Sequence, residues 1–177
     1  MLPGSYRVRL TANAHSVEQS FEILADPRLG SRVAELAAQL DMLRDIHARL
    51  RQCNELVNKI ARLEDQIASL RRWAPAVPEM VEAVAAKLEA MKPVLIDVNM
   101  RQAQLHASGL HEKLNGLIEF VDSGDYAPAQ QARDVFAELV AQLDDVTHQF
   151  DSTVRDGIPE LARLVGESLS EAVMMPV

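Results

Sequence analysis

Apolar residues recur at intervals of three and four over residues 33–70, and this spacing constrains the fold more than any other feature of the chain. Such intervals place the side chains on one face of an α-helix. Ser31 is a suitable N-cap, and Pro75 and Pro78 end the helix after about Trp73. At 1.5 Å per residue the helix spans roughly 65 Å and needs other helices to cover its apolar face. The apolar positions are Val33, Leu36, Leu40, Leu43, Ile46, Leu50, Cys53, Val57, Ile60, Leu63, Ile67 and Leu70.

Later segments repeat this spacing and predict the helices that pack against the first one. Pro93 is expected to break or kink the second helix, and residues 94–108 show no regular pattern. We therefore predict a mainly α fold, an antiparallel bundle of long helices. The predicted helices run from Pro78 to about Met91, over 110–121 and over 128–156, with a short final helix or a bent continuation over 158–170.

The first 28 residues have a different period and predict a β-hairpin. Apolar and polar residues alternate over 6–11 and again over 20–23, as expected for strands with one covered face. If residues 13–16 form a four-residue loop, Val8 pairs with Phe21, Tyr6 with Ile23, and Arg7 opposes Glu22. The segment 26–28, with Pro27 at its centre, then ends the sheet.

Two strands alone are marginally stable in water and need more strands or a covering layer. We therefore expect the sequence to open inside a β-domain whose earlier strands are missing. This divides the chain into a terminal hairpin at 1–28 and a helical bundle region at 29–177.

Composition narrows the possible partners. The net charge is −8 and no basic stripe offsets it, which argues against nucleic-acid binding. No apolar run reaches the ~20 residues of a membrane span, and no signal peptide follows Met1. Basic residues outnumber acidic ones up to residue 73 and acidic ones dominate after it, so the long helices can attract each other.

Cys53 allows no intrachain disulfide and is expected to be a small core residue.

Few residues suggest chemistry, and we predict no catalytic, cofactor-binding or metal-ligating residue. Asp144 and Asp145 lie four and three residues before His148 on one predicted helix, but no second pair of this kind completes a metal centre. His106 and His111 are five residues apart and fall on different helical faces. Trp73 is expected to close the end of the bundle, and Arg7 and Arg9 are taken as structural. An enzyme built on Asp144, Asp145 and His148 remains a third hypothesis.

Five segments together resemble the C-terminal region of bacterial sortilin-type β-propeller proteins, a family of glycosyl hydrolases with BNR/Asp-box repeats. The first two resemble the last strands of the family's Ig-like domain, and the others resemble its helical region. The segments are LPGSYRVRLT (2–11), FEILADPR (21–28), LNGL (114–117), GDYAPAQQA (124–132) and PELARLV (159–165).

This resemblance implies a large propeller, then an Ig-like β-sandwich, then a helical region, with the hairpin as a remnant of the sandwich. The chain is then a non-catalytic C-terminal accessory or assembly module of an exported, periplasmic or extracellular protein. Its partners are the missing Ig-like and propeller domains, with a possible homo-oligomer through the long helix. The alternative is a free-standing coiled-coil interaction or oligomerisation protein.

Overall fold

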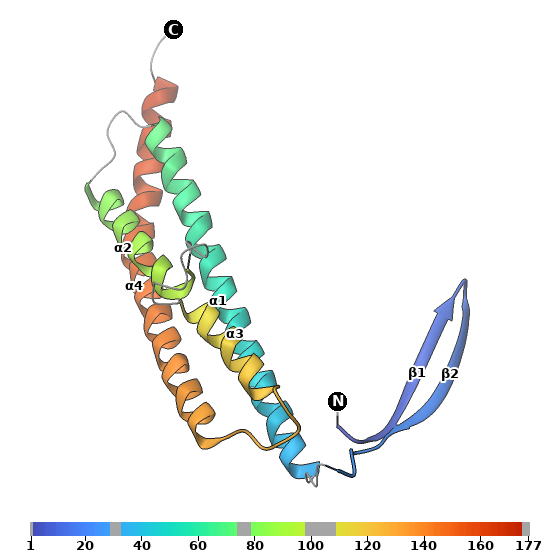
Figure 1. Ribbon diagram of the computed structural model, residues 1–177. Coiled ribbons are helices and arrows are strands. Elements are labelled where there is room, and N and C mark those ends of the chain that lie inside the picture. Colours follow the sequence, from blue (N-terminus) through green and yellow to red (C-terminus); the bar gives the residue numbers. More distant parts are fainter. Residues whose placement is uncertain (1, 29–32, 74–78, 98–108, 175–177) are drawn as a thin grey trace.

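The computed structural model describes residues 2–28, 33–73, 79–97 and 109–174 (Figure 1). A two-stranded hairpin precedes the helices, so the prediction of a mainly α chain with an N-terminal hairpin is confirmed. Ser31, Pro75, Pro78 and the segment 98–108 lie outside the described residues. The elements are β1 (Gly4–Ala12), β2 (His15–Ile23), α1 (Val33–Trp73), α2 (Glu79–Leu95), α3 (Leu110–Val121) and α4 (Gln130–Met174).

The helices form a long bundle in which α2 and α3 lie one after the other along α1, in the place of a single third helix. α1 and α4 run in the same direction along the bundle, and α2 and α3 run in the opposite direction (Figure 1). α2 packs beside the C-terminal half of α1, and α3 packs beside its N-terminal half. The cross-section is therefore that of three helices, although the described chain supplies four.

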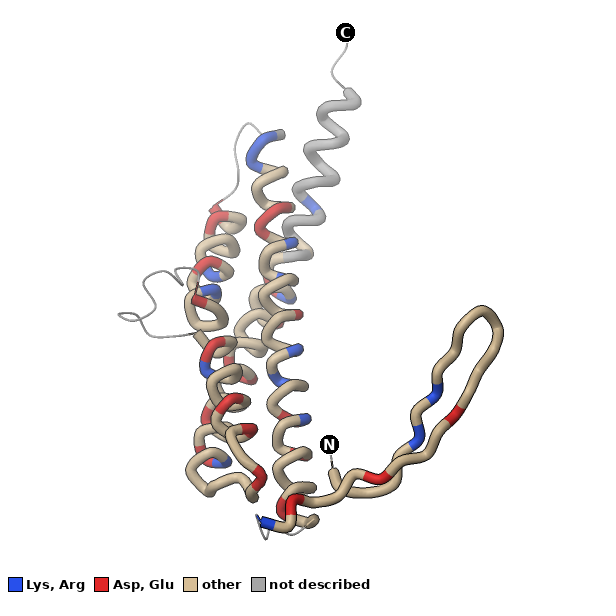
Figure 2. The backbone as a smooth tube through the Cα atoms, turned by 45° about the vertical axis from the view of Figure 1, so that its right-hand side comes forward, with Lys and Arg blue, Asp and Glu red and all other residues tan. Residues whose placement is uncertain are grey.

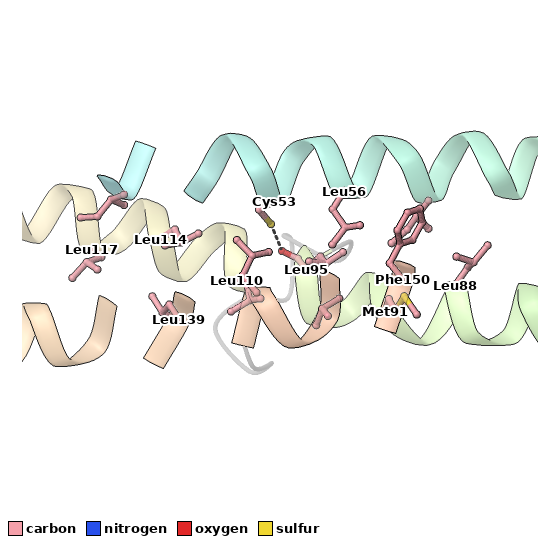
Figure 3. Close-up of a cluster of buried hydrophobic side chains, with 14 of the residues drawn as sticks. Cys53, Leu56, Leu88, Met91, Leu95, Leu110, Leu114, Leu117, Leu139 and Phe150 are labelled. Atoms are coloured by element: carbon pink, nitrogen blue, oxygen red, sulfur yellow. Dashed lines mark hydrogen bonds between the residues drawn. The ribbon is translucent and has the colours of Figure 1, made fainter. Parts of the chain in front are cut away.

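One apolar core runs along this bundle, as the spacing of three and four predicts. Ile46, Cys53 and Ile60 of α1 have no exposed surface. Leu95 at the end of α2 and Leu110 at the start of α3 are equally buried, and both lie close to Cys53 (Figure 3). The core therefore continues without interruption where one helix replaces the other.

The junction between α2 and α3 is tightly packed. A Cβ atom on Gly109 would lie 2.7 Å from the backbone nitrogen of Ile96 and 2.8 Å from its Cα. Glu112 Oε2 accepts a hydrogen bond from the backbone N–H of Asp97 at 3.1 Å. The end of α2 and the start of α3 therefore lie at neighbouring points beside α1.

At two prolines the sequence left alternatives open, and the helix is continuous through both. α2 does not break at Pro93 but continues to Leu95, and Ile96 N–H still donates to Lys92 O at 2.9 Å. α4 continues past residue 156 to Met174, with Pro159 inside it, so the segment 158–170 is a continuation of α4 and not a separate short helix. In both helices the residues after the proline keep the helical path, because one lost hydrogen bond does not outweigh the cooperative bonding on either side.

A buried glutamine fastens the end of α3 to α1. The Gln39 side chain is 7% exposed, and its Nε2 donates to Val121 O at 2.7 Å and to Gly124 O at 2.5 Å. Carbonyl groups at a helix C-terminus have no partner within the helix. Gln39 supplies one, and so positions the turn that leads into α4.

The hairpin register differs from the predicted one by two residues. Tyr6 pairs with Phe21, and Val8 with Gln19. Asn13 and Ala14 have φ angles of 48° and 71°, which makes the connection a two-residue turn instead of a four-residue loop. Turns with positive φ at both central residues fit the twist of a hairpin, and asparagine tolerates this conformation. A shift of two residues leaves every side chain on its predicted face.

Two glycines of the α3 region form a matched test of the packing at the junction. We expect Gly109→Ala to lower the free energy of unfolding by about 1–3 kcal/mol, because its methyl group meets the Ile96 backbone. Gly116 is exposed on α3 with open space around it, so Gly116→Ala should raise stability by about 0.5–1 kcal/mol. Urea unfolding followed by circular dichroism measures both; equal effects of the two substitutions would contradict the packing described here.

Candidate interaction surface

Residues 2–28 form an arm that projects from the end of the bundle where α1 begins. Figures 1 and 2 both show this arm standing apart from the helices. Among the described residues, no Cα atom of β1 or β2 comes within 8 Å of a helix Cα atom. The arm is therefore a separate structural feature and the first candidate for an interaction surface.

The polar face of the arm is held together by its own charges. Glu18 on β2 accepts hydrogen bonds from both Arg7 and Arg9 on β1; the Arg7 Nη1–Glu18 Oε2 distance is 3.1 Å. Nearer the turn, the hydroxyl groups of Thr11 and Ser16 are 3.2 Å apart. The predicted opposition of Arg7 and Glu22 is wrong, because the shorter turn brings Ser20 opposite Arg7. Glu18 was missed for the same reason.

The opposite face is apolar and open to solvent. Leu10 is 71% exposed, Val17 68% and Val8 52%. At the base of the arm two aromatic rings shield each other in part from solvent: the Tyr6 and Phe21 ring centroids lie 5.9 Å apart, with 27° between the ring planes. An antiparallel sheet with one apolar face normally packs that face against a second layer. We call Tyr6, Val8, Leu10, Val17 and Phe21 the apolar face of the arm.

The link between the arm and α1 is stabilised within itself. Asp26 accepts hydrogen bonds from the backbone N–H of Arg28 at 2.9 Å and from its guanidinium group at 2.7 Å. The side-chain bond, and then the backbone bond, hold the pKa of Asp26 below its usual value. The predicted exit segment 26–28 therefore forms a local turn, and Pro27 in it is exposed.

The structure does not bring Asp144, Asp145 and His148 together as a ligand set. Arg49 Nη1 lies 2.9 Å from Asp144 Oδ1 and ties that carboxylate to α1. Asp145 lines a groove between α2 and α4, and His148 is exposed. Among the residues that the structure describes, no three His, Cys, Asp or Glu side chains are placed to hold a metal ion.

His111 and four charged residues of α1 and α2 have partners within the chain, whereas the surroundings of the Trp73 side chain lie outside what the structure describes. The His111 ring nitrogen Nδ1 lies 3.2 Å from Glu112 Oε1, while His106 falls outside the described residues. Trp73 is the last residue of α1. Ion pairs Arg71–Glu82 and Glu64–Lys92 join α1 to α2. Only the first has the sense that the charge difference suggested, because in the second pair the acid is on α1 and the base on α2.

Cys53 is the buried core residue that the sequence predicts. Its thiol has no exposed surface and donates a long hydrogen bond of 3.6 Å to Leu95 O. Burial, with a smaller contribution from the negative charge of Glu112, raises the pKa of this thiol from 9.0 to about 11. The thiolate is the reactive form of cysteine, so Cys53 is chemically inert in the folded chain.

Comparison of this chain with protein-family models, with curated proteins and with solved structures gave no match. Within the described part of the chain, no helix has the length and apolar character needed to cross a membrane. The surface must therefore be interpreted from its own geometry.

The raised pKa of Cys53 predicts a loss of stability in alkaline solution. The unfolded chain releases the thiol proton from about pH 9, whereas the folded chain keeps it until about pH 11. The free energy of unfolding should therefore fall as the pH rises through this range. Cys53→Ala should be less stable than the wild type at about pH 8 but should show a smaller alkaline decline. Urea titrations of both proteins at several pH values test this, and parallel declines would contradict it.

Proposed function

We propose that this chain is a non-catalytic C-terminal accessory and assembly module of an exported glycosyl-hydrolase-like protein of the sortilin-type, BNR-repeat kind. The observation that carries the proposal is the exposed apolar face of the arm beside a bundle that buries its own core. The bundle is the self-sufficient part of the module. The arm is the part that needs a partner, and a β-layer of a preceding Ig-like domain has the matching chemistry.

The size of the apolar face supports a partner in the same polypeptide. Two strands of nine residues offer an apolar patch on the order of a few hundred Å². A stable interface between separate proteins buries about 800 Å² on each side. A tethered partner is present at an effective concentration near the millimolar range, so a smaller surface is sufficient.

The burial of α1 favours this proposal over a free-standing coiled coil. A coiled-coil partner would need the apolar seam of α1, yet Ile46, Ile60 and Ile67 on that seam are at most 2% exposed. The helices of the same chain already cover them. The central part of that seam is therefore closed to a partner, while the arm keeps its apolar face open to solvent.

The proposal predicts that the arm becomes protected in the complete protein. The reading frame upstream of Met1 should continue into Asp-box repeats and Ig-like strands. In the product of that longer frame, the backbone amides of residues 4–23 should exchange with deuterium at least about tenfold more slowly than in the 177-residue chain.

Two substitutions on opposite faces provide the matched control. Val17→Arg places a charge on the apolar face and should remove the protection in the longer protein, whereas Ser16→Arg on the polar face should leave it intact. A stop codon directly before Met1 would overturn the proposal. The proposal would also be overturned if the 177-residue chain formed a stable oligomer, measured by light scattering, in which the amides of residues 4–23 already exchange slowly.

A further inference from the structure

A cavity separates the base of the arm from the side of α1. Its volume is about 280 Å³, and its lining combines apolar residues with three aspartates and a glutamine. Ile23 and Leu24 contribute from the arm, and Leu36, Leu40 and Leu43 contribute from α1. The arm and α1 therefore already face each other across a cavity whose lining is partly apolar.

On α1 the leucines of this lining continue as a stripe away from the cavity. Leu36, Leu40, Leu43, His47 and Leu50 follow one another at intervals of four and three, which places them along one face of the helix. The four leucines are half-buried and His47 is exposed. We call these five residues the leucine stripe.

The apolar face of the arm matches this stripe in length and reaches the cavity at its base. Ile23 has the same orientation on β2 as Phe21 and Val17, so a residue of the apolar side lines the cavity together with Leu24 and Asp26. Val8 lies four residues farther along the ribbon than Ile23, which is about 14 Å. The same distance along α1 from Leu40 ends between His47 and Leu50.

We infer that the arm closes onto α1 of the same chain, with its apolar face against the leucine stripe, when no partner layer covers that face. The exposed residues Leu24 and Ala25, between β2 and the turn that Asp26 and Arg28 hold, are the place where the arm turns. Closure continues from the cavity along the helix and leaves Arg7, Arg9 and Glu18 in solvent. This inference concerns the chain alone and does not depend on the proposed function.

A designed disulfide tests the closed state. The double variant Val8→Cys, His47→Cys joins the apolar face to the leucine stripe, and the buried thiol of Cys53 does not compete. Under mild oxidation we expect a disulfide within one chain, formed about tenfold faster than in the control Arg9→Cys, His47→Cys. In the control the cysteine is one residue along β1 from Val8, so it lies at nearly the same distance from the link, but Arg9 is on the opposite face of the arm.

The pattern of products decides the outcome. Gel mobility without reductant and mass spectrometry identify the crosslink, and circular dichroism checks that both variants keep the helical bundle. Equal rates in the two variants would show an arm without a preferred face, and absence of crosslinks in both would show an arm that stays open. Crosslinks between two chains would show that a second copy covers the face; each of these three results overturns the inference.

Discussion

The bundle depends on one continuous buried stripe on α1. α1 is 41 residues long, and two shorter helices in succession, α2 and then α3, cover its stripe. This works only because the replacement happens without a gap: Gly109 lies directly against the backbone of Ile96, and Leu95 and Leu110 meet near Cys53 (Figure 3). A void at this point would remove packing from the centre of the core, where the loss of each buried methylene group lowers the free energy of unfolding.

The helices could be predicted from the sequence because their apolar residues recur at the helical period. The contacts that position them could not, since they join distant residues. Gln39 binds the carbonyl of Val121, and Glu112 binds the backbone of Asp97, yet neither residue differs in local sequence from an ordinary surface position. Likewise, the apolar spacing after Pro159 fits both a separate short helix and a continuation of α4, and only the structure shows which of the two forms.

The arm shows a different limit of prediction from the sequence. Its two faces follow from simple alternation, which needs only the side-chain period of a strand. The register depends instead on the backbone angles of Asn13 and Ala14, and alanine gives no local sign that it adopts a positive φ. The candidate surface was therefore predictable as a set of residues, while the pairing of Glu18 with two arginines was not.

The junction of α2 and α3 also has a consequence for the evolution of this chain. The backbone leaves the bundle beside Asp97 and returns at Gly109, and the described residues on each side pack these two points next to each other. The number of residues between them can then change without altering the rotation or the height of either helix. We therefore expect the bundle to tolerate a longer or shorter chain at this point, and a foreign domain inserted there to leave the packing around Cys53 intact.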